Sequence, residues 1–213
     1  MKFITKGGEP DKILEWKSKD KMYQRGKPNW NRLKSELKEL LRDSISAEQG
    51  YICCYCERRL NTNEMHIEHF KPKDPNKFPL NQLDYDNLFC SCQLELEKGE
   101  PRHCGNSKGS WFDEDIIISP LEPNCETKFK YTIDGQILPE DKNDIGARAT
   151  IEKLKLDIDK LNKLREKAIE PFLDEDLTQE DLDEFVQGYL VEKEDNDGYY
   201  NEFYTTIKYL FEN

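Results

Sequence analysis

The spacing of apolar positions in the first half of the chain changes at residue 50. Before it, large apolar side chains recur every three or four residues, at Trp30, Leu33, Leu37, Leu40 and Leu41. This period predicts a helix over residues 29–49, which Gly50 can end in the left-handed conformation. From 51 to 111 the period is lost, and short strand-like pieces alternate with Gly, Pro and Asn. We therefore expect an irregular, loop-rich region there.

Extended patterns follow in the third quarter of the chain. Residues 115–119 form a short apolar run that predicts a strand. An Asp-Gly pair then separates residues 129–133 from residues 136–138, which is the pattern of a tight β-hairpin. Both features predict β structure outside the irregular region.

Helical patterns fill the remainder. Residues 145–170 carry one apolar face, and Asp157 is placed to cap a second helix within that stretch. Thr178 and Asp181 match a capping box at the start of a further short helix. The apolar side chains of 199–211 again fall on one helical face. The chain is therefore expected to be mixed in secondary structure.

Charge divides the 213 residues into unlike parts. The net charge is −12, yet residues 1–109 carry 20 Lys and Arg against 17 Asp and Glu, a net of +3. Residues 110–213 carry 12 against 27, a net of −15, and residues 174–213 alone carry 2 against 13. The second part would repel a polyanion and the first would tolerate one. The other interpretation is that both parts are ordinary solvated surfaces, and the asymmetry itself suggests two lobes.

The sequence excludes two broad classes of protein. No stretch reaches the ~18 consecutive apolar residues of a membrane helix, and the first eight residues lack the apolar segment of a signal peptide. Seven cysteines in such a chain favour metal binding or reduced thiols over disulfides. We expect a cytoplasmic protein without a membrane partner.

Six of the seven cysteines lie between residues 53 and 104. The first C-x-x-C pair has the spacing by which a tight turn presents two thiolates to one tetrahedral zinc ion. With a second pair downstream, the predicted structural zinc ligands are Cys53, Cys56, Cys92 and Cys104. The other interpretation is that these four are small buried apolar side chains. Cys54 and Cys125 are interpreted as thiols that bind no metal.

An acid, an asparagine and histidines are interleaved with these cysteines. Glu68 and His69 are neighbours in a strand-like segment, where adjacent side chains point to opposite faces. One carboxylate can therefore bind a hard cation while the imidazole handles a proton. Asn87 and His103 follow in order, whereas His66 is interpreted as a packed or hydrogen-bonded histidine. This order is far more specific than any one of its parts.

The stretch from Cys53 to Gly109 resembles HNH endonucleases, ββα-metal nucleases whose fold is held by a zinc knuckle. Its motifs are Cys-x-Tyr-Cys-Glu, Ile-Glu-His-Phe-x-Pro-Lys, Tyr-x-Asn-Leu-Phe-x-Ser-Cys and His-Cys-Gly-x-x-Lys-Gly. Together they are similar to a narrower group, the PtuB-like HNH subunits of Septu and retron anti-phage systems. The motifs cover 57 of the 213 residues.

This resemblance implies a role for each residue. His69 matches the general base that deprotonates a water for attack on phosphorus, and Asn87 matches the residue that orients this imidazole. Glu68 and His103 would hold one divalent ion, magnesium or manganese, on the scissile phosphate. Lys108 would contact a phosphate, and the zinc would be purely structural.

The sequence departs from the plain HNH pattern at its second cysteine pair. Eleven residues separate Cys92 from Cys104, where the simpler pattern has two. The position directly after this pair, which in the family holds a metal-binding His or Asn, is Gly105. Glycine has no side chain to coordinate a metal, so His103 or Asn106 has to supply the last ligand. We choose His103.

The sequence thus predicts an α+β protein in three segments. These are an N-terminal helical segment, 1–49, an HNH ββα-metal zinc domain, 50–112, and an acidic, mostly helical lobe with a β-hairpin, 113–213. The predicted function is metal-dependent cleavage of nucleic acid, with DNA favoured over RNA. The alternatives are a non-catalytic, zinc-stabilised binding module and the same nuclease acting on RNA.

The acidic end of the chain also suggests a protein partner. Residues 174–213 carry eight aromatic side chains, namely Phe185, Tyr189, Tyr199, Tyr200, Phe203, Tyr204, Tyr209 and Phe211. An acidic surface with aromatic anchors suits docking onto a basic protein. The resemblance implies that this partner is a PtuA-like ATPase of the ABC or SMC-like type. The other interpretation is that these aromatic residues form the core of the lobe itself.

Overall fold

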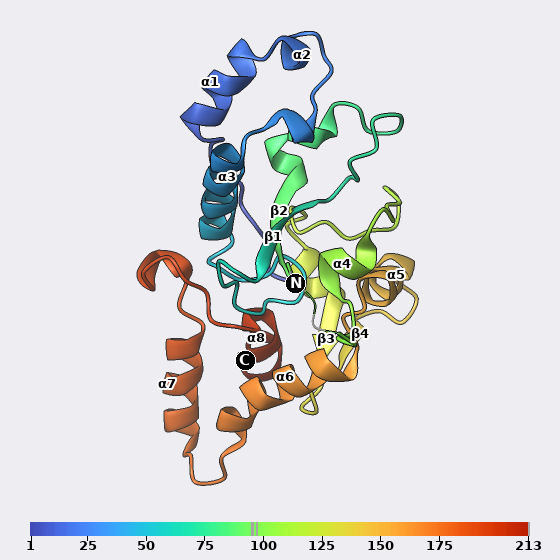
Figure 1. Ribbon diagram of the computed structural model, residues 1–213. Helices are drawn as coiled ribbons and strands as arrows, with labels where there is room; N and C mark the ends of the chain where they lie inside the picture. The colour runs from blue at the N-terminus through green and yellow to red at the C-terminus, as the bar shows by residue number, and fades with distance from the viewer. Residues whose placement is uncertain (95, 97, 213) are drawn as a thin grey trace.

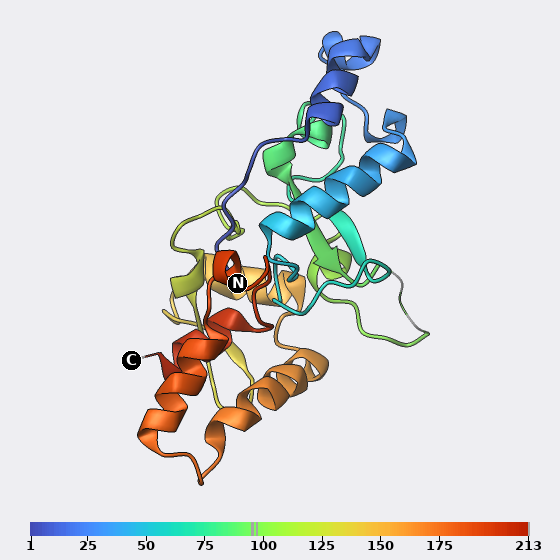
Figure 2. The same ribbon diagram turned by 90° about the vertical axis from the view of Figure 1, so that its left-hand side faces the viewer.

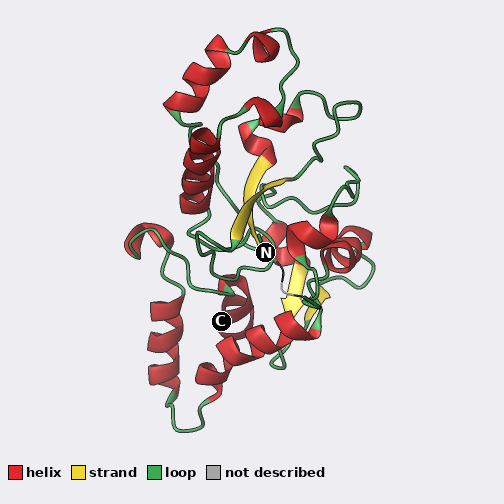
Figure 3. Cartoon of the chain, in the orientation of Figure 1, coloured by secondary structure: helices red, strands yellow, loops and turns green. Residues whose placement is uncertain are grey.

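A two-stranded antiparallel sheet occupies the middle of an elongated molecule, with helices towards both ends (Figures 1 and 2). β1 (Met65–His69) pairs with β2 (Leu88–Cys92), so that Met65 lies opposite Cys92 and His69 opposite Leu88. The short helix α4 (Cys104–Lys108) follows β2 in the chain. This computed structural model describes residues 1–94, 96 and 98–212. Its mixture of helices and small sheets (Figure 3) confirms the α+β prediction.

The N-terminal region contains more elements than its apolar period predicts. α1 (Asp11–Lys19) and α2 (Lys21–Gln24) precede a 3-10 turn at Trp30–Arg32, and α3 (Ser35–Glu48) begins only after it. The predicted helix over 29–49 is therefore divided. The Trp30 N–H donates to Gln82 Oε1 (3.2 Å), which ties the turn to the region around the sheet.

The described residues of the C-terminal half contain a hairpin and four α-helices, besides short 3-10 turns. β3 (Phe129–Tyr131) and β4 (Ile137–Pro139) pair antiparallel around the predicted Asp-Gly turn, which confirms that hairpin. The helices are α5 (Ile145–Leu154), α6 (Asp159–Ile169), α7 (Gln179–Tyr189) and α8 (Tyr204–Phe211). Thr178 and Asp181 form the expected capping box of α7. Among the described residues, none of the helices has the length and apolar character needed to cross a bilayer.

Two local predictions are wrong. Residues 115–117 form a turn and bend, and residues 118–119 are irregular. The segment is not a strand, because the Ile118 N–H donates to Thr150 Oγ1 (3.0 Å) and no described strand pairs with it. Asp157 does not cap the second helix of its region. The break comes instead at Lys155, which adopts φ +49°, and α6 follows Ile158 without a side-chain cap.

The C-terminal segment packs directly against the cysteine-rich loop. The Tyr200 N–H donates to the Gly50 carbonyl (3.0 Å), and the Phe203 N–H donates to the Glu57 carbonyl (3.1 Å). The Glu57 carboxylate accepts the Thr205 N–H (2.8 Å) and pairs with the amino group of Met1 (2.6 Å). Contacts therefore cross the boundaries of the three predicted segments, and that division stays a prediction.

Gly135 offers a test of how the hairpin meets α6. It adopts φ +78°, and a Cβ atom there would lie 2.1 Å from the Asn162 carbonyl oxygen. Gly135→Ala should therefore lower the free energy of unfolding by at least ~2 kcal/mol in chemical denaturation, through backbone strain and collision with α6.

The matched control is Gly188→Ala in α7, where an added Cβ meets nothing within 4 Å. Alanine is the better helix former, so this variant should gain up to ~1 kcal/mol. A Gly135→Ala protein as stable as the wild type would contradict the packing of the hairpin on α6.

Candidate active site

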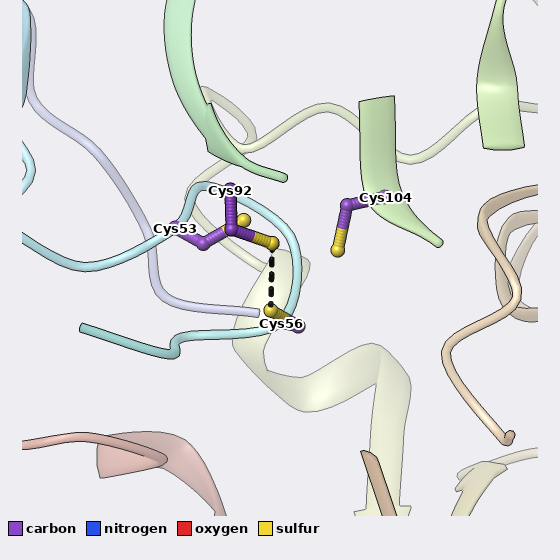
Figure 4. Close-up of side chains that lie close together, drawn as sticks. All are labelled: Cys53, Cys56, Cys92 and Cys104. Carbon is purple, nitrogen blue, oxygen red and sulfur yellow. Dashed lines mark hydrogen bonds between the residues drawn. The ribbon is translucent and has the colours of Figure 1, made fainter. Parts of the chain in front are cut away.

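Four cysteine side chains converge from three separate pieces of chain (Figure 4). Cys53 and Cys56 lie in the loop after α3, Cys92 ends β2 and Cys104 begins α4. All four are buried, and their Sγ atoms lie within 4.8 Å of one another. The Sγ atoms of Cys56 and Cys92 are 3.8 Å apart, and a tetrahedral ion with Zn–S bonds of ~2.3 Å separates its sulfur ligands by about 3.8 Å. This donor set fits a structural metal such as zinc.

The shifted pKa values of these thiols also indicate a site that a cation would stabilise. Burial acts to raise the pKa of the Cys53 thiol, but hydrogen bonds from the neighbouring sulfur atoms, Cys104 first, hold it well below its usual range. Burial and the same neighbours raise the pKa of Cys104 far above its usual value. Four thiolates cannot crowd together unless a positive ion replaces their protons. A divalent ion would satisfy all four at once.

The other described cysteines lie outside this group. Cys90 Sγ donates to the Arg42 carbonyl (3.4 Å), and Cys125 Sγ donates to the Met1 carbonyl (3.7 Å). Burial raises the pKa of Cys125 to about 12, so this thiol stays protonated. These contacts are those of packed thiols.

His69, at the end of β1, is buried and held through one ring nitrogen. Its Nε2 lies 3.0 Å from the Gln82 carbonyl oxygen, and the Trp30 ring meets its own ring edge-on at 4.7 Å. A carbonyl can only accept, so Nε2 carries the proton and Nδ1 is left to take one up.

Burial is the main cause that lowers the pKa of His69, to about 4. The Gln82 carbonyl and the Glu68 charge act in the opposite direction, whereas Lys73 and Lys108 lower the pKa further. The imidazole is therefore neutral at neutral pH, which is the form that accepts a proton.

The Asn87 side chain binds backbone groups of two segments, Lys71 just after β1 and Asn81 in the loop that leads to β2. Its Oδ1 accepts the Lys71 N–H (2.6 Å), and its Nδ2 donates to the carbonyls of Lys71 (3.0 Å) and Asn81 (2.8 Å). Asn81 directly precedes Gln82, whose carbonyl binds His69. The predicted orienting role of Asn87 would thus act through the backbone, and it stays a prediction.

Glu68 is buried beside a lysine from α4. Its Oε1 lies 2.7 Å from Lys108 Nζ and 3.4 Å from the Tyr55 hydroxyl, while its Oε2 lies 3.8 Å from His66 Nε2. Burial alone would raise the pKa of the carboxyl, but His66 and Lys108 together hold it below its usual value. Glu68 is therefore ionised, and Lys108 is buried against it instead of open to a phosphate.

His103 lies at the cysteine cluster. Its side chain is fully buried, and its Nδ1 is 3.1 Å from Cys104 Sγ and 3.7 Å from Cys92 Sγ. Among the described contacts none joins His103 to Glu68, and Asn106 Nδ2 instead donates to the Gln93 carbonyl. The choice of His103 as the last ligand of the catalytic ion stays a prediction.

Two lysines near His69 were missed by sequence reasoning. Lys38 Nζ and Lys73 Nζ lie 5.2 and 5.7 Å from the centre of the Trp30 ring. Burial and then repulsion from Lys38 lower the pKa of Lys73. Neither lysine has a carboxylate partner among the described ion pairs, so both suit a phosphate. Only the fold brings them together, since they lie 35 positions apart in the chain.

Comparison with known proteins finds one informative relative. The chain is 34% identical over 139 residues to the "Retron Vc95 putative HNH endonuclease" of Vibrio cholerae serotype O1 biovar El Tor. The aligned stretch covers 63% of this chain and 65% of that relative, so the chain matches just under two thirds of its length. No protein-family profile matches the chain. The similarity confirms the predicted resemblance to HNH endonucleases, and the name of that relative assigns it to a retron. The narrower PtuB-like assignment stays a prediction.

The cysteine cluster generates a prediction about metal content. One zinc per chain should survive dialysis, and Cys53→Ser or Cys104→Ser should remove it and abolish the cooperative thermal transition, because binding energy at such sites is folding energy. Metal analysis and thermal unfolding together measure both effects. Cys90→Ser is the matched control, since a hydroxyl can still donate to the Arg42 carbonyl. Retention of the transition in metal-free protein would contradict the prediction.

Proposed function

We propose that this chain is a metal-dependent nuclease that cleaves phosphodiester bonds, with β1, β2 and α4 as its ββα-metal core. The observation that carries the proposal is the presence, side by side at the end of β1, of a carboxylate that can bind a metal and an imidazole that can accept a proton. There an ionised Glu68 adjoins a neutral His69 whose protonated Nε2 is already bound to a carbonyl. The similarity to a retron HNH endonuclease supports the same reaction.

Four of the residues in the candidate active site have a role in this reaction. His69 Nδ1 would take the proton from a water whose oxygen attacks phosphorus, while the bond from phosphorus to the leaving oxygen breaks. Lys38 and Lys73 would hold the phosphate backbone beside Trp30. Glu68 would hold the divalent ion, which supplies charge stabilisation at the leaving oxygen when it is bound.

A zinc-stabilised binding module without catalysis is the competing function. The structure gives an argument against it, since the four cysteines complete a tetrahedral site without Glu68 or His69. A purely structural zinc site has no use for a buried carboxylate and a buried neutral imidazole in addition. DNA is our proposed substrate, and cleavage of RNA alone would assign the same site to the other polymer.

Cleavage of a supercoiled plasmid with magnesium or manganese tests the reaction. His69→Ala should lower the rate at least ~10²-fold, because it removes the general base. Zinc content and the thermal transition should be those of the wild type, since His69 is not part of the cysteine cluster.

Glu64→Ala, which changes an exposed acid near the start of β1, is the matched control and should cleave normally. Equal rates for His69→Ala and wild type would exclude His69 as the base. The assay should be run on the native complex as well as on the isolated chain, since a partner can be required.

We further propose that the chain serves in an anti-phage complex with an ATPase of the ABC or SMC-like type. The exposed acids of the C-terminal lobe support a basic partner. The aromatic side chains there contribute less than the sequence suggests. Tyr200 and Tyr204 are buried against Ile52 of the cysteine-rich loop, Phe203 is also buried, and Phe185 stacks on Phe172.

Neutralising the exposed acids around α7 tests this partner. The variant replaces six carboxylates by amides, at Asp174, Glu175, Asp176, Glu180, Asp183 and Glu184. It should fold normally, because all six are exposed, and should lose co-elution with the ATPase in purification from the native host.

Amide substitutions at Glu36, Glu39 and Asp43, which are exposed on α3, are the control and should leave co-elution intact. Undiminished co-elution of the six-site variant would place the docking surface elsewhere.

A further inference from the structure

His66 lies beside Glu68, on the same face of β1. Residues two apart in a strand share a face, and His66 Nε2 lies 3.8 Å from Glu68 Oε2. Its Nδ1 is buried and has no hydrogen-bond partner among the described residues. The imidazole is therefore paired with the carboxylate and with no other polar group in this part of the chain.

Gly105 shows how closely this pair approaches α4. A Cβ atom at position 105 would lie 2.6 Å from Glu68 Oε2 and 2.9 Å from His66 Nε2. In the pattern that the chain resembles, this position carries the last metal ligand. Here the space that such a side chain would need is filled by His66 and Glu68, two residues of β1. The histidine nearest to this position therefore belongs to the strand and not to α4.

Neither of the two ligands considered from the sequence contacts Glu68 among the described residues, although His103 Nε2 is buried there without a hydrogen-bond partner. His103 Nδ1 lies against the sulfur atoms of Cys104 and Cys92, and Asn106 Nδ2 donates to the Gln93 carbonyl. His66 is thus the histidine that the fold brings to Glu68.

We propose that His66 and Glu68 are the protein ligands of the divalent cation, and that the Lys108 ammonium group holds this site when the cation is absent. The proposal rests on the nuclease function given above. Two adjacent ligands at ~2.1 Å from an octahedral ion stand about 3.0 Å apart. The separation of 3.8 Å between His66 Nε2 and Glu68 Oε2 is wider than this, so a small side-chain movement has to bring the two ligands together when the cation binds.

Lys108 occupies the position of a built-in counter-ion. Its side chain is fully buried, and Nζ lies 2.7 Å from Glu68 Oε1 and 3.0 Å from the His69 carbonyl. A divalent ion brings twice the charge to the same carboxylate, and two cations repel each other strongly in a buried site. Lys108 must therefore move aside when the metal binds, and its charge sets the metal concentration that the site requires.

Binding of Mn²⁺ to the full zinc-loaded chain, measured by electron paramagnetic resonance without nucleic acid, tests the proposal. Manganese prefers oxygen and imidazole ligands to thiolates, so it reports on this site and not on the cysteines. His66→Ala should weaken Mn²⁺ binding at least ~10-fold, whereas His103→Gln should leave it unchanged. Lys108→Gln should strengthen it at least ~10-fold, and Lys77→Gln, at an exposed lysine, is the control without effect.

Each result decides between assignments. Wild-type affinity in His66→Ala, or no Mn²⁺ binding by the wild-type chain, would overturn the proposal. Weaker binding in Lys108→Gln would also overturn it, since it would make the lysine a support of the metal and not a competitor. If His66→Ala fails to fold, as judged by zinc content and thermal transition, His66→Gln is subject to the same outcomes.

The same measurement separates this proposal from the nuclease function. A chain that binds Mn²⁺ through His66 and leaves nucleic acid uncut contradicts only the function. A chain that cuts nucleic acid, with Mn²⁺ affinity unaffected by His66→Ala, contradicts only the ligand assignment.

Discussion

Four sulfur atoms hold together the pieces of chain that build the candidate active site. Cys104, at φ +53°, starts α4 in a conformation that few residues other than glycine adopt, and the cysteine cluster keeps it there. α4 in turn directs Lys108 and the Gly105 backbone at β1. The loop of Cys53 and Cys56 closes the other side. The position of Glu68 relative to α4 therefore depends on a cysteine cluster to which Glu68 does not belong.

Local chemistry explains which features could be predicted from the sequence. The C-x-x-C pair, the Asp-Gly hairpin and the capping box of Thr178 are each specified by a few adjacent residues, and the structure contains all three elements. The ordered motifs also predict that Glu68 and His69 are neighbours on a strand. Such signals survive because little tertiary context can override them.

The features that sequence reasoning missed depend on contacts between distant segments. The apolar run at 115–119 has strand character, but the fold offers it the Thr150 hydroxyl instead of a neighbouring strand. His66 has the alternating spacing that would pair it with Glu68, yet only the approach of Gly105 shows that the imidazole lies where a side chain at position 105 would stand. The sequence alone does not show that α4 packs against the face of β1 that carries His66.

Glu57 directly follows the last cysteine of the first pair, and its carboxylate accepts the Thr205 N–H almost 150 positions later. One side chain thus connects the cysteine-rich loop to the segment that leads into α8. During synthesis the cysteine-rich loop emerges long before its neighbour around residue 205. The nascent chain therefore carries a cysteine-rich loop that lacks this contact until the segment around residue 205 has emerged.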